Sequence, residues 1–433
     1  MRVLVVGGGG REHALAWRMR RDASVTDVLA APGNPGIAQE ARCIDVRADD
    51  PTGLVDLARR EHVDLVVVGP EAPLVAGLAD AMQASGVPVF GPSAAAARLE
   101  GSKAFAKELM ARAGVPTARS ATFARRDWEA DPRRVLSYLD ELGDGSAVVK
   151  ADGLAAGKGV VVADRRDQAA AAVEAVLGRG EFGEAGASVV VEERLEGREV
   201  SAFALSDGRR VVPLAFAQDA KRVGDGDAGP NTGGMGAFSP VPFVDADTAE
   251  RIRIDVFERT VEAMAADGVP YRGVVYAGLM LTEVGPKVLE YNCRFGDPET
   301  QALMPLLRTD PAALLLACAR GTLGDRSVEL APLACVTVVV ASRGYPGDHR
   351  TGLEVSGLEA AGSVDGATVF HSGTAERRGR VVTAGGRVVS VSAVGDSLAE
   401  ARDRAYEAVS YVGFEGRYHR TDIAARAAKE EGT

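Results

Sequence analysis

The segment LEYNCRFGDPE, residues 289–299, carries a carboxylate, an amide and a guanidinium in close succession. Side chains alternate along a strand, so Glu290 and Asn292 are expected on one face and Tyr291 on the other. Arg294 is expected on the face of the two oxygen ligands. Burying these polar groups without partners would be costly. A magnesium ion held by protein oxygens and ATP phosphates would satisfy them, so the segment predicts phosphate chemistry assisted by a metal.

The stretch KADGLAAGKGV, residues 150–160, places two lysines around closely spaced glycines. A Walker loop is excluded, because that motif has four residues between its glycines and a Ser or Thr after the lysine. Here Gly153 and Gly157 enclose three residues, and Gly159 follows Lys158. Apolar runs on both sides predict a hairpin whose loop is a movable cover over a nucleotide. Lys150 and Lys158 are either solvated or, with the loop amides, neutralise a polyphosphate.

The strand exit VVVEERLEGRE gathers acidic side chains. They are Glu192, Glu193, Glu196 and Glu199. One interpretation is a solvated acidic turn. The other is a nucleotide site, in which the strand exit offers backbone donors and acceptors to an adenine edge and Glu199 accepts the ribose hydroxyls.

The elements that must position these groups begin at the N-terminus. Residues 3–6 read as a buried strand and residues 11–20 as a helix, and the two patterns alternate over the first hundred residues. This alternation predicts a doubly wound parallel sheet. The loops at the carboxyl ends of its strands, residues 7–10, 32–36, 69–73 and 91–93, should converge on a ligand crevice.

The glycine turn after the first strand is expected to bind a phosphorylated small molecule. Its phosphate would face the amides of residues 8–11 and the N-terminus of the following helix. The alternative is that the glycines only permit a tight turn. A dinucleotide is disfavoured, because Glu12 stands where the third glycine of G-x-G-x-x-G should be.

Composition narrows the function further. The chain has 433 residues, 46% of them hydrophobic, and 61 acidic against 50 basic residues give a net charge of -11. This balance argues against a nucleic-acid surface and leaves anionic ligands to local sites. The four cysteines form no CxxC pair, so neither a zinc site nor a disulfide framework is indicated. The N-terminal apolar run is too short for a signal peptide and no stretch approaches a membrane span, so we expect a cytoplasmic protein without a membrane partner.

No nucleophilic triad is recognisable, because none of the five histidines pairs with a Ser or Cys in a known motif. The chemistry expected is therefore phosphoryl transfer, which needs positioning and charge neutralisation rather than an enzyme nucleophile.

Together these segments resemble the ATP-grasp superfamily and, within it, the phosphoribosylamine-glycine ligase family, also called glycinamide ribonucleotide synthetases. The resemblance runs nearly end to end. Its blocks are GGREHALAW, APGNPG, VGPEAPLV, FGPS, LEGSKAF, KADGLAAGKGVVVA, QDAKRVGDGDAGPNTGGMGAFSP, YAGLM, EYNCRFGDPETQ, GYPGDHRTG and FHSGT. NTGGMGA and NCRFGDPETQ are the most specific of them.

The resemblance implies a multidomain protein of α/β and α+β class. An N-terminal Rossmann-like substrate domain with the doubly wound parallel sheet is expected over residues 1–102. A central ATP-grasp domain is expected over 103–328, with a hairpin lid subdomain at about 121–191. A small C-terminal α+β domain is expected over 329–433.

The implied reaction is an ATP-dependent ligation in de novo purine biosynthesis. Glycine carboxylate attacks the γ-phosphate to give glycyl phosphate and ADP, and the amine of 5-phosphoribosylamine then displaces phosphate to give glycinamide ribonucleotide. The partners are these small molecules, ATP and Mg²⁺ or Mn²⁺, and the expected oligomeric state is a monomer, with a dimer as the alternative. Two other functions stay open: an ATP-grasp carboxylase or formate-using transferase of the same pathway, and a regulatory protein that binds nucleotide without turnover.

The resemblance also implies roles for particular residues. Lys103, Lys150, Gly157 and Lys158 would contact ATP phosphates, Glu192, Glu193 and Leu195 the adenine, and Glu199 the ribose, while Glu290 and Asn292 would hold the metal. Arg294, Lys150 and Asp219 would be catalytic, with Arg294 stabilising charge on the transferring phosphoryl group or the glycine carboxylate. The substrates would be held by Gly9, Gly10, Arg11, Glu12, Asn34, Pro70, Glu71, Lys221, Asn231, Thr232, Gly233, Gly234 and Arg294.

Three features depart from the family pattern. Gly8 stands where the family often has Asn, so a side-chain amide near the expected phosphate is missing. Arg343 stands where a glycine is common. The strand YAGLMLT has no acidic residue before Glu283, whereas many ATP-grasp enzymes have a further metal ligand there.

Overall fold

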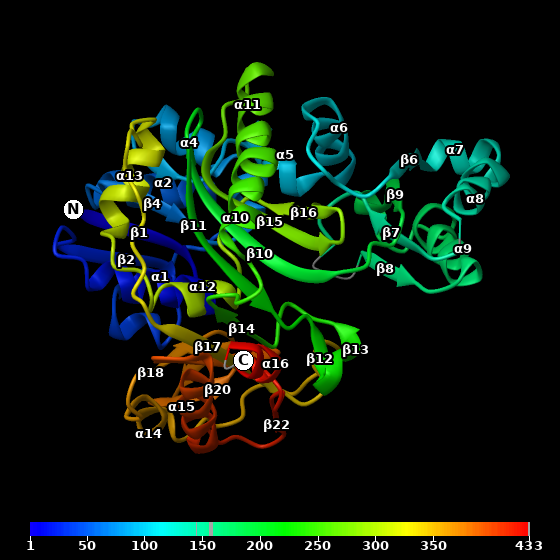
Figure 1. The fold of residues 1–433 in the computed structure, drawn as a ribbon. Coiled ribbons are helices and arrows are strands. Elements are labelled where there is room, and N and C mark those ends of the chain that lie inside the picture. Colours follow the sequence, from blue (N-terminus) through cyan, green and yellow to red (C-terminus); the bar gives the residue numbers. More distant parts are fainter. Residues whose placement is uncertain (144, 156–158, 432–433) are drawn as a thin grey trace.

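A computed structural model of the chain describes residues 1–143, 145–155 and 159–431 (Figure 1). The N-terminal part is a parallel sheet of order β3-β2-β1-β4-β5. Its strands are β1 (Arg2–Gly7), β2 (Asp27–Pro32), β3 (Arg42–Cys43), β4 (Leu65–Val68) and β5 (Val89–Phe90). The helices between and after them are α1 (Gly10–Arg20), α2 (Pro51–Arg60), α3 (Glu71–Val75), α4 (Leu78–Ala84) and α5 (Ala94–Gly101). The predicted doubly wound parallel sheet is confirmed, and the apolar runs of β1 and β4 are buried on both faces.

Helix α6 (Lys103–Ala113) leads into a four-stranded antiparallel sheet, which we call the lid sheet. Its order is β6-β9-β7-β8, from β6 (Ser120–Ala124), β7 (Ala147–Ala151), β8 (Val160–Ala163) and β9 (Ser188–Glu192). It is accompanied by α7 (Arg125–Ala130), α8 (Pro132–Glu141) and α9 (Arg166–Val173), which continues as a π-helical segment, Glu174–Gly178. These elements project away from the rest of the molecule (Figure 1) and have a hydrophobic core of their own. The predicted hairpin is present, because β7 and β8 pair antiparallel from Ala147 opposite Ala163 to Lys150 opposite Val160.

The largest sheet is antiparallel and has the order β16-β15-β10-β11-β14-β17-β21-β18, with β22 beside β17. Its strands are β10 (Arg198–Asp207), β11 (Val211–Asp219), β14 (Gly236–Ser239), β15 (Arg272–Thr282), β16 (Gly285–Asn292), β17 (Ala334–Ser342), β18 (Ala367–His371), β21 (Arg387–Gly395) and β22 (Arg417–Tyr418). Two small hairpins are formed by β12 (Arg222–Gly224) with β13 (Ala228–Asn231) and β19 (Thr374–Arg377) with β20 (Arg380–Thr383). The β14–β17 pairing joins the central and C-terminal parts of the chain into one sheet.

Helices cover this sheet and close the C-terminal part. They are α10 (Ala246–Arg251), α11 (Arg259–Ala266), α12 (Glu299–Leu303), α13 (Pro311–Arg320), α14 (Leu358–Gly362), α15 (Leu398–Tyr411) and α16 (Ala425–Glu431). Within the described ranges, no helix combines the length and the apolar character needed to cross a lipid bilayer.

Candidate active site

The proposed metal ligands lie at the end of β16, which pairs with β15. Glu290 is opposite Gly278 and Asn292 opposite Tyr276, while Tyr291 is buried and shares a hydrogen bond of 2.6 Å with Thr260. The predicted alternation is therefore confirmed for Tyr291. Burial alone would raise the pKa of Glu290, but the surrounding Lys221, Lys150, Lys103 and Arg294 hold it below its usual value.

A carboxylate and an amide oxygen are the donor types that a hard divalent cation prefers, so Glu290 and Asn292 fit Mg²⁺ or Mn²⁺. In the described part of the chain, no group of three or more His, Cys, Asp or Glu side chains is arranged to hold a metal ion. Mg²⁺ in nucleotide sites is commonly held by only one or two protein carboxylates, with substrate phosphates completing its coordination.

Lys150 lies on β7 at the base of the lid sheet and points toward this site. Its Nζ contacts Glu192 Oε2 at 3.0 Å and donates to the carbonyl of Leu289 at 2.8 Å, directly before Glu290. The other oxygen of Glu192 is 3.2 Å from Nζ of Lys107 on α6. All three side chains are buried, so Glu192 is a carboxylate held between two ammonium groups.

Lys103 begins α6, and the end of β7 fixes that helix terminus. Asp152 accepts hydrogen bonds from Ser102 Oγ at 2.9 Å and from the amide of Ala104 at 2.8 Å. Nζ of Lys103 is 3.5 Å from the carbonyl of Gly153. Burial and the neighbouring Lys150 lower the pKa of Lys103, whereas Glu290 raises it. Two of the predicted phosphate ligands, Gly157 and Lys158, lie outside the described residues.

The predicted adenine and ribose contacts follow β9. The Glu192 carboxylate is occupied by the two lysines and is therefore not free to meet an adenine. Glu193 accepts from the amide of Arg119 at 2.9 Å and pairs with Lys287 at 3.3 Å. Leu195 is half-buried on the link to β10. Glu199, on β10, is exposed and forms an ion pair with Lys221 at 3.2 Å.

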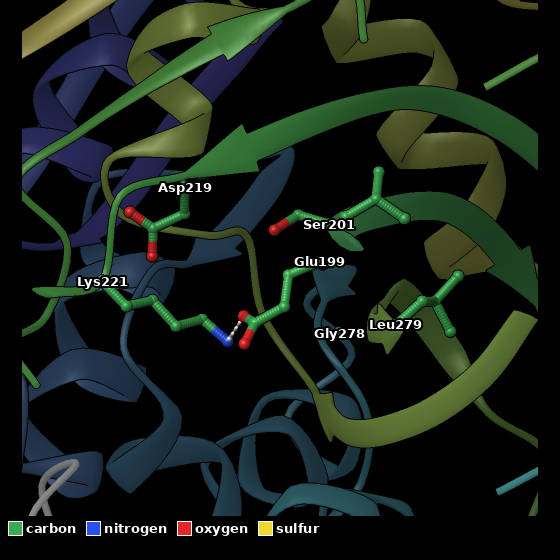
Figure 2. A pocket seen from close by; sticks show the side chains of 7 residues that line it. Glu199, Ser201, Asp219, Lys221, Gly278 and Leu279 are labelled. Carbon is green, nitrogen blue, oxygen red and sulfur yellow. Dashed lines mark ion pairs between the residues drawn. The ribbon is translucent and has the colours of Figure 1, made fainter. Parts of the chain in front are cut away.

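A small cavity opens between β10, β11 and β15, beside this ion pair (Figure 2). Its lining residues are Glu199, Val200, Ser201, Asp219, Lys221, Gly278 and Leu279. Asp219 Oδ1 is buried and has no hydrogen-bond partner among the residues that the structure describes. Burial and the nearby Glu299 carboxylate raise the pKa of Asp219 well above its usual range. Glu299 itself accepts hydrogen bonds from Tyr276 at 2.6 Å and from Ser201 at 3.0 Å.

Arg294 is held by two carboxylates at the border with the N-terminal sheet. Its Nε lies 3.2 Å from Glu71 Oε2 and its Nη2 lies 3.3 Å from Glu100 Oε1. Glu100 also accepts from the amide of Cys293 at 2.8 Å. Glu71 opens α3 after Pro70, so the structure brings Arg294 together with two of the predicted substrate residues.

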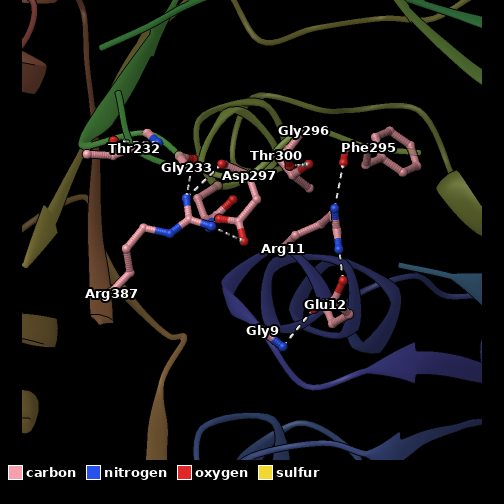
Figure 3. A network of polar contacts seen from close by, with 12 residues as sticks. Gly9, Arg11, Glu12, Thr232, Gly233, Phe295, Gly296, Asp297, Thr300 and Arg387 are labelled. Atoms are coloured by element: carbon pink, nitrogen blue, oxygen red, sulfur yellow. Dashed lines mark hydrogen bonds and ion pairs between the residues drawn. The ribbon is translucent and has the colours of Figure 1, made fainter. Parts of the chain in front are cut away.

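The glycine turn before α1 differs in one respect from the expectation. The sequence predicts that the amides of residues 8–11 face a phosphate. The amide of Gly9, however, donates to Glu12 Oε2 at 2.6 Å and is therefore not free for a phosphate. Glu12 Oε1 accepts from Arg11 Nε at 2.6 Å, and Arg11 Nη1 donates to the carbonyl of Phe295 at 3.1 Å (Figure 3). Glu12 thus shapes the turn from inside, while the amides of Gly10 and Arg11, in the first helical turn, have no intrahelical partner.

Asn34 has a structural role that the sequence did not reveal. Its amide donates to the carbonyls of Gly8 and His371, both at 2.9 Å, and its oxygen accepts from the amides of Gly36 and Ile37. These four bonds use all the capacity of the side chain. The predicted contact of the Asn34 side chain with substrate is therefore corrected, because the group holds two loops together instead.

The turn formed by Thr232, Gly233 and Gly234 is held from the C-terminal part of the chain (Figure 3). Arg387, on β21, donates to the carbonyl of Gly233 at 2.5 Å and contacts Asp297 Oδ2 at 3.1 Å. Tyr345 accepts from the amide of Gly233 at 2.9 Å. Asn231, before the turn, is exposed at the end of β13.

Gly234 packs closely against Asp219 and Pro298. A Cβ at this position would lie 2.3 Å from Pro298 and 2.7 Å from Asp219 Oδ1, and its φ is +104°. Only glycine fits this conformation and spacing without displacement.

Four residues of the site were missed from the sequence: Glu100, Lys107, Tyr345 and Arg387. Lys107 had a signal, since it follows Lys103 by one helical turn and faces the same side. The other three reach the site only through tertiary packing, although Glu100 and Tyr345 stand in the blocks LEGSKAF and GYPGDHRTG.

Comparison with known families places this geometry in context. Three family models match: the N domain of phosphoribosylglycinamide synthetase over residues 1–100, its ATP-grasp (A) domain over 101–300 and its C domain over 335–426. The chain is 52% identical over 431 residues to a phosphoribosylamine-glycine ligase of Rhizobium meliloti, covering 100% of both chains. It is also 52% identical over 435 residues to one of Streptomyces coelicolor, covering 99% of this chain and 100% of the other.

Solved structures show the same relationship. The chain is similar to a phosphoribosylamine-glycine ligase from Thermotoga maritima with a TM-score of 0.85 and 34% identity, covering 98% of this chain and 100% of the other. It also shares its fold with the biotin carboxylase domain of a Hydrogenobacter thermophilus 2-oxoglutarate carboxylase, at a TM-score of 0.71 and 18% identity, covering 96% and 91%.

Proposed function

The chain belongs to the phosphoribosylglycinamide synthetase family, and from this premise we propose that it joins glycine to 5-phosphoribosylamine with ATP, in the ligase step of de novo purine biosynthesis. The products are glycinamide ribonucleotide, ADP and phosphate. The observation that carries the proposal is the set of cationic groups around Glu290, in which Lys221, Lys150, Lys103 and Arg294 act on one half-buried carboxylate. Such a set suits the neutralisation of a polyphosphate beside a metal ligand.

The reaction is proposed to proceed through glycyl phosphate. A carboxylate oxygen of glycine attacks the γ-phosphorus, and the bond between that phosphorus and the ADP oxygen breaks. The amine nitrogen of phosphoribosylamine then attacks the acyl carbon, phosphate leaves with the bonding electron pair, and the nitrogen loses one proton. Lys150 and Lys103 are assigned to the ATP phosphates, and Arg294 to the developing charge on the transferring phosphoryl group or the glycine carboxylate.

Asp219 is proposed to receive the proton that the amine loses. Its unpartnered Oδ1 lies beside the cavity of Figure 2, and burial together with Glu299 makes this carboxylate more basic than an exposed one. General bases in enzymes commonly obtain their basicity in this way. Lys221 and the turn of Thr232, Gly233 and Gly234, which border this site, are assigned to substrate binding.

Glu290 and Asn292 are proposed to hold the divalent cation, Mg²⁺ or Mn²⁺, whose chemistry is to bind ATP oxygens and offset their charge. Glu193 and Leu195 are assigned to the adenine and Glu199 to the ribose. The turn that carries Gly9, Gly10 and Arg11 is assigned to phosphoribosylamine. The boundaries at 102 and 328, a monomeric state and a cytoplasmic location stay predictions.

The test is an ADP-release assay with freshly prepared phosphoribosylamine. We expect ADP release only when glycine and phosphoribosylamine are both present, and no stimulation by bicarbonate or formate. Release driven by bicarbonate or formate would point to the carboxylase or transferase alternative. Nucleotide binding with no release under any of these conditions would point to a regulatory protein.

A further inference from the structure

Lys107 is buried beside the nucleotide site, yet it cannot serve as a ligand. An ammonium group has three N–H donors. Those of Lys107 are directed at Thr117 Oγ1 at 2.8 Å, at the carbonyl of Ala118 at 3.0 Å and at Glu192 Oε1 at 3.2 Å. The residue is only 8% exposed. Lys107 therefore has no donor left for a phosphate, and its role must act through the residues that it touches.

Lys150 differs from Lys107 in this respect. Two of its donors are directed at Glu192 Oε2 at 3.0 Å and at the carbonyl of Leu289 at 2.8 Å. Counting partners within the described ranges, one donor remains for a ligand. The two lysines and Glu192 carry a net charge of +1 together, and without Lys107 the pair of Glu192 and Lys150 would sum to zero. Without Lys107, the buried Glu192 carboxylate would be compensated by Lys150 alone.

We propose that Lys107 is a positioning residue that neutralises Glu192, so that the charge of Lys150 stays available to the ATP phosphates. This inference rests on the proposed function, because it takes Lys150 as a phosphate ligand. It assigns Lys107 a function at a distance from ATP. The ion pair with Glu192 orients the Lys150 side chain. The ion pair of Glu192 with Lys107 keeps Glu192 from neutralising the charge of Lys150.

The alternative is that Lys107 only stabilises the packing between α6 and β9. The effect of the Lys107 charge can be distinguished from the effect of its packing by comparing Lys107→Met alone with the double variant Lys107→Met, Glu192→Gln. The single variant Lys107→Met removes the neutralising charge, whereas the double variant restores the net charge of +1 on Lys150 and keeps an amide oxygen that can accept from it.

The experiment measures the dissociation constant of Mg-ADP by calorimetry, without glycine or phosphoribosylamine. We expect Lys107→Met to weaken binding by about tenfold or more, since it leaves a buried carboxylate to Lys150 alone. The double variant should return to within about threefold of the wild type. A double variant that binds as weakly as Lys107→Met, or more weakly, would overturn the charge proposal.

A second measurement remains decisive if Lys107→Met does not fold. Burial lowers the pKa of Lys107 to about 8. Glu192 and Glu193 act to raise this pKa, and Lys150 acts to lower it. Lys107 then loses its charge as the pH rises through about 8. We expect Mg-ADP binding to weaken between pH 7 and pH 9 in the wild type and to weaken clearly less in Lys107→Arg, which stays charged. Equal pH profiles would refute the role of the Lys107 charge.

Two controls keep this result separate from the proposed function. Arg112→Met removes an exposed cation of the same helix, paired with Asp267 at 2.7 Å, and should bind Mg-ADP as the wild type does. Lys150→Met tests the premise: if it binds Mg-ADP normally, the assignment of Lys150 fails whatever Lys107 does. The wild-type ligase assay reports on the reaction independently of both.

Discussion

Glu290 is the side chain on which the charges of the site converge. Its carboxylate is surrounded by four cationic groups that hold its pKa low, and Lys221 Nζ lies 3.9 Å from its Oε1. A carboxylate that remains ionised in such surroundings is a ready metal ligand. Neutralising it would weaken cation binding and leave the cationic groups less compensated in the absence of nucleotide.

We expect Glu290→Gln to lower turnover by about a hundredfold or more, because charge offset by a bound metal contributes several kcal/mol. The measurement is the ADP-release rate as a function of Mg²⁺ concentration, and the deficit should be largest at limiting Mg²⁺. Glu283→Gln, in the exposed turn between β15 and β16, is the matched control and should behave as the wild type. Full activity of Glu290→Gln at limiting Mg²⁺ would remove Glu290 from the metal site.

Local pattern was enough to predict some of these side chains and not others. Strand alternation placed Tyr291 in the core and set Glu290 and Asn292 apart from it, because that rule depends only on the strand itself. The Glu192 carboxylate was assigned to ATP contacts without its lysine partners, because Lys107 reaches it from another element. Asn34 was likewise assigned to substrate, although its bonds to Gly8 and His371 depend on loops that only the fold brings together.

At the scale of elements, β21 contributes a side chain to the site although it lies far along the sequence from the other site residues. Arg387 joins the carbonyls of Gly233 and Asp297 and also contacts the Asp297 carboxylate (Figure 3). It thereby connects the turn at Gly233 with the segment that follows Arg294. Gly234, next in the turn, lies against Asp219 and Pro298, so a displaced turn would disturb the proposed proton acceptor.

We expect Arg387→Gln to reduce kcat by about tenfold or more, because it releases the turn beside Asp219, while shifting the thermal midpoint little, because Asp297 keeps its hydrogen bond from Gln301 at 2.7 Å. The measurements are steady-state kinetics with glycine as the varied substrate, and thermal melting. Arg380→Gln, which breaks an exposed ion pair with Glu354 in the same part of the chain, is the control and should retain wild-type kinetics. Unchanged kinetics in Arg387→Gln would show that the turn does not need this contact.

The sequence predicted which segments form strands better than it predicted which strands pair with one another. Turn residues and apolar runs indicated the β7–β8 hairpin, because a hairpin is a local structure. The order β6-β9-β7-β8 of the lid sheet inserts β9, which comes last in the chain, beside β7 and places Glu192 diagonally across from Lys150. Nothing in the strands themselves specifies that order, because a short strand of four or five residues does not encode which neighbour it pairs with.

At the scale of the whole molecule, the site is built by all parts of the chain. The N-terminal loops supply Glu71, α6 and the lid sheet supply the lysines, and β21 supplies Arg387. The large sheet continues from the central into the C-terminal part through β14 and β17. The family resemblance implied a separate domain from residue 329, but a sequence pattern carries no information on which strands pair across such a position.

The N-terminal and C-terminal parts also meet directly, through two buried histidines. His13 Nδ1 on α1 accepts from the amide of His371, at the end of β18, at 2.8 Å. His371 Nδ1 is in turn 3.1 Å from Thr374 Oγ1. Burial lowers the pKa of His371 to about 4, and burial together with His371 and Arg21 lowers that of His13 to about 3. Both rings are therefore neutral in the folded protein at neutral pH.

These depressed pKa values fix the sign of a pH effect on stability. An unfolded histidine takes up a proton near pH 6.5, whereas the folded ones resist protonation, so the stabilisation is complete above about pH 6.5 and is lost progressively toward pH 4. We expect the free energy of unfolding to fall by about 3 kcal/mol over this window from His371 alone. His13→Asn retains an acceptor in the place of Nδ1 and cannot titrate, so its thermal midpoint should decline less steeply with falling pH. His62→Asn, at an exposed position whose positive φ of 51° suits Asn, is the control and should keep the wild-type slope. Identical slopes for His13→Asn and the wild type would show that acid acts elsewhere than at this contact between the two ends of the molecule.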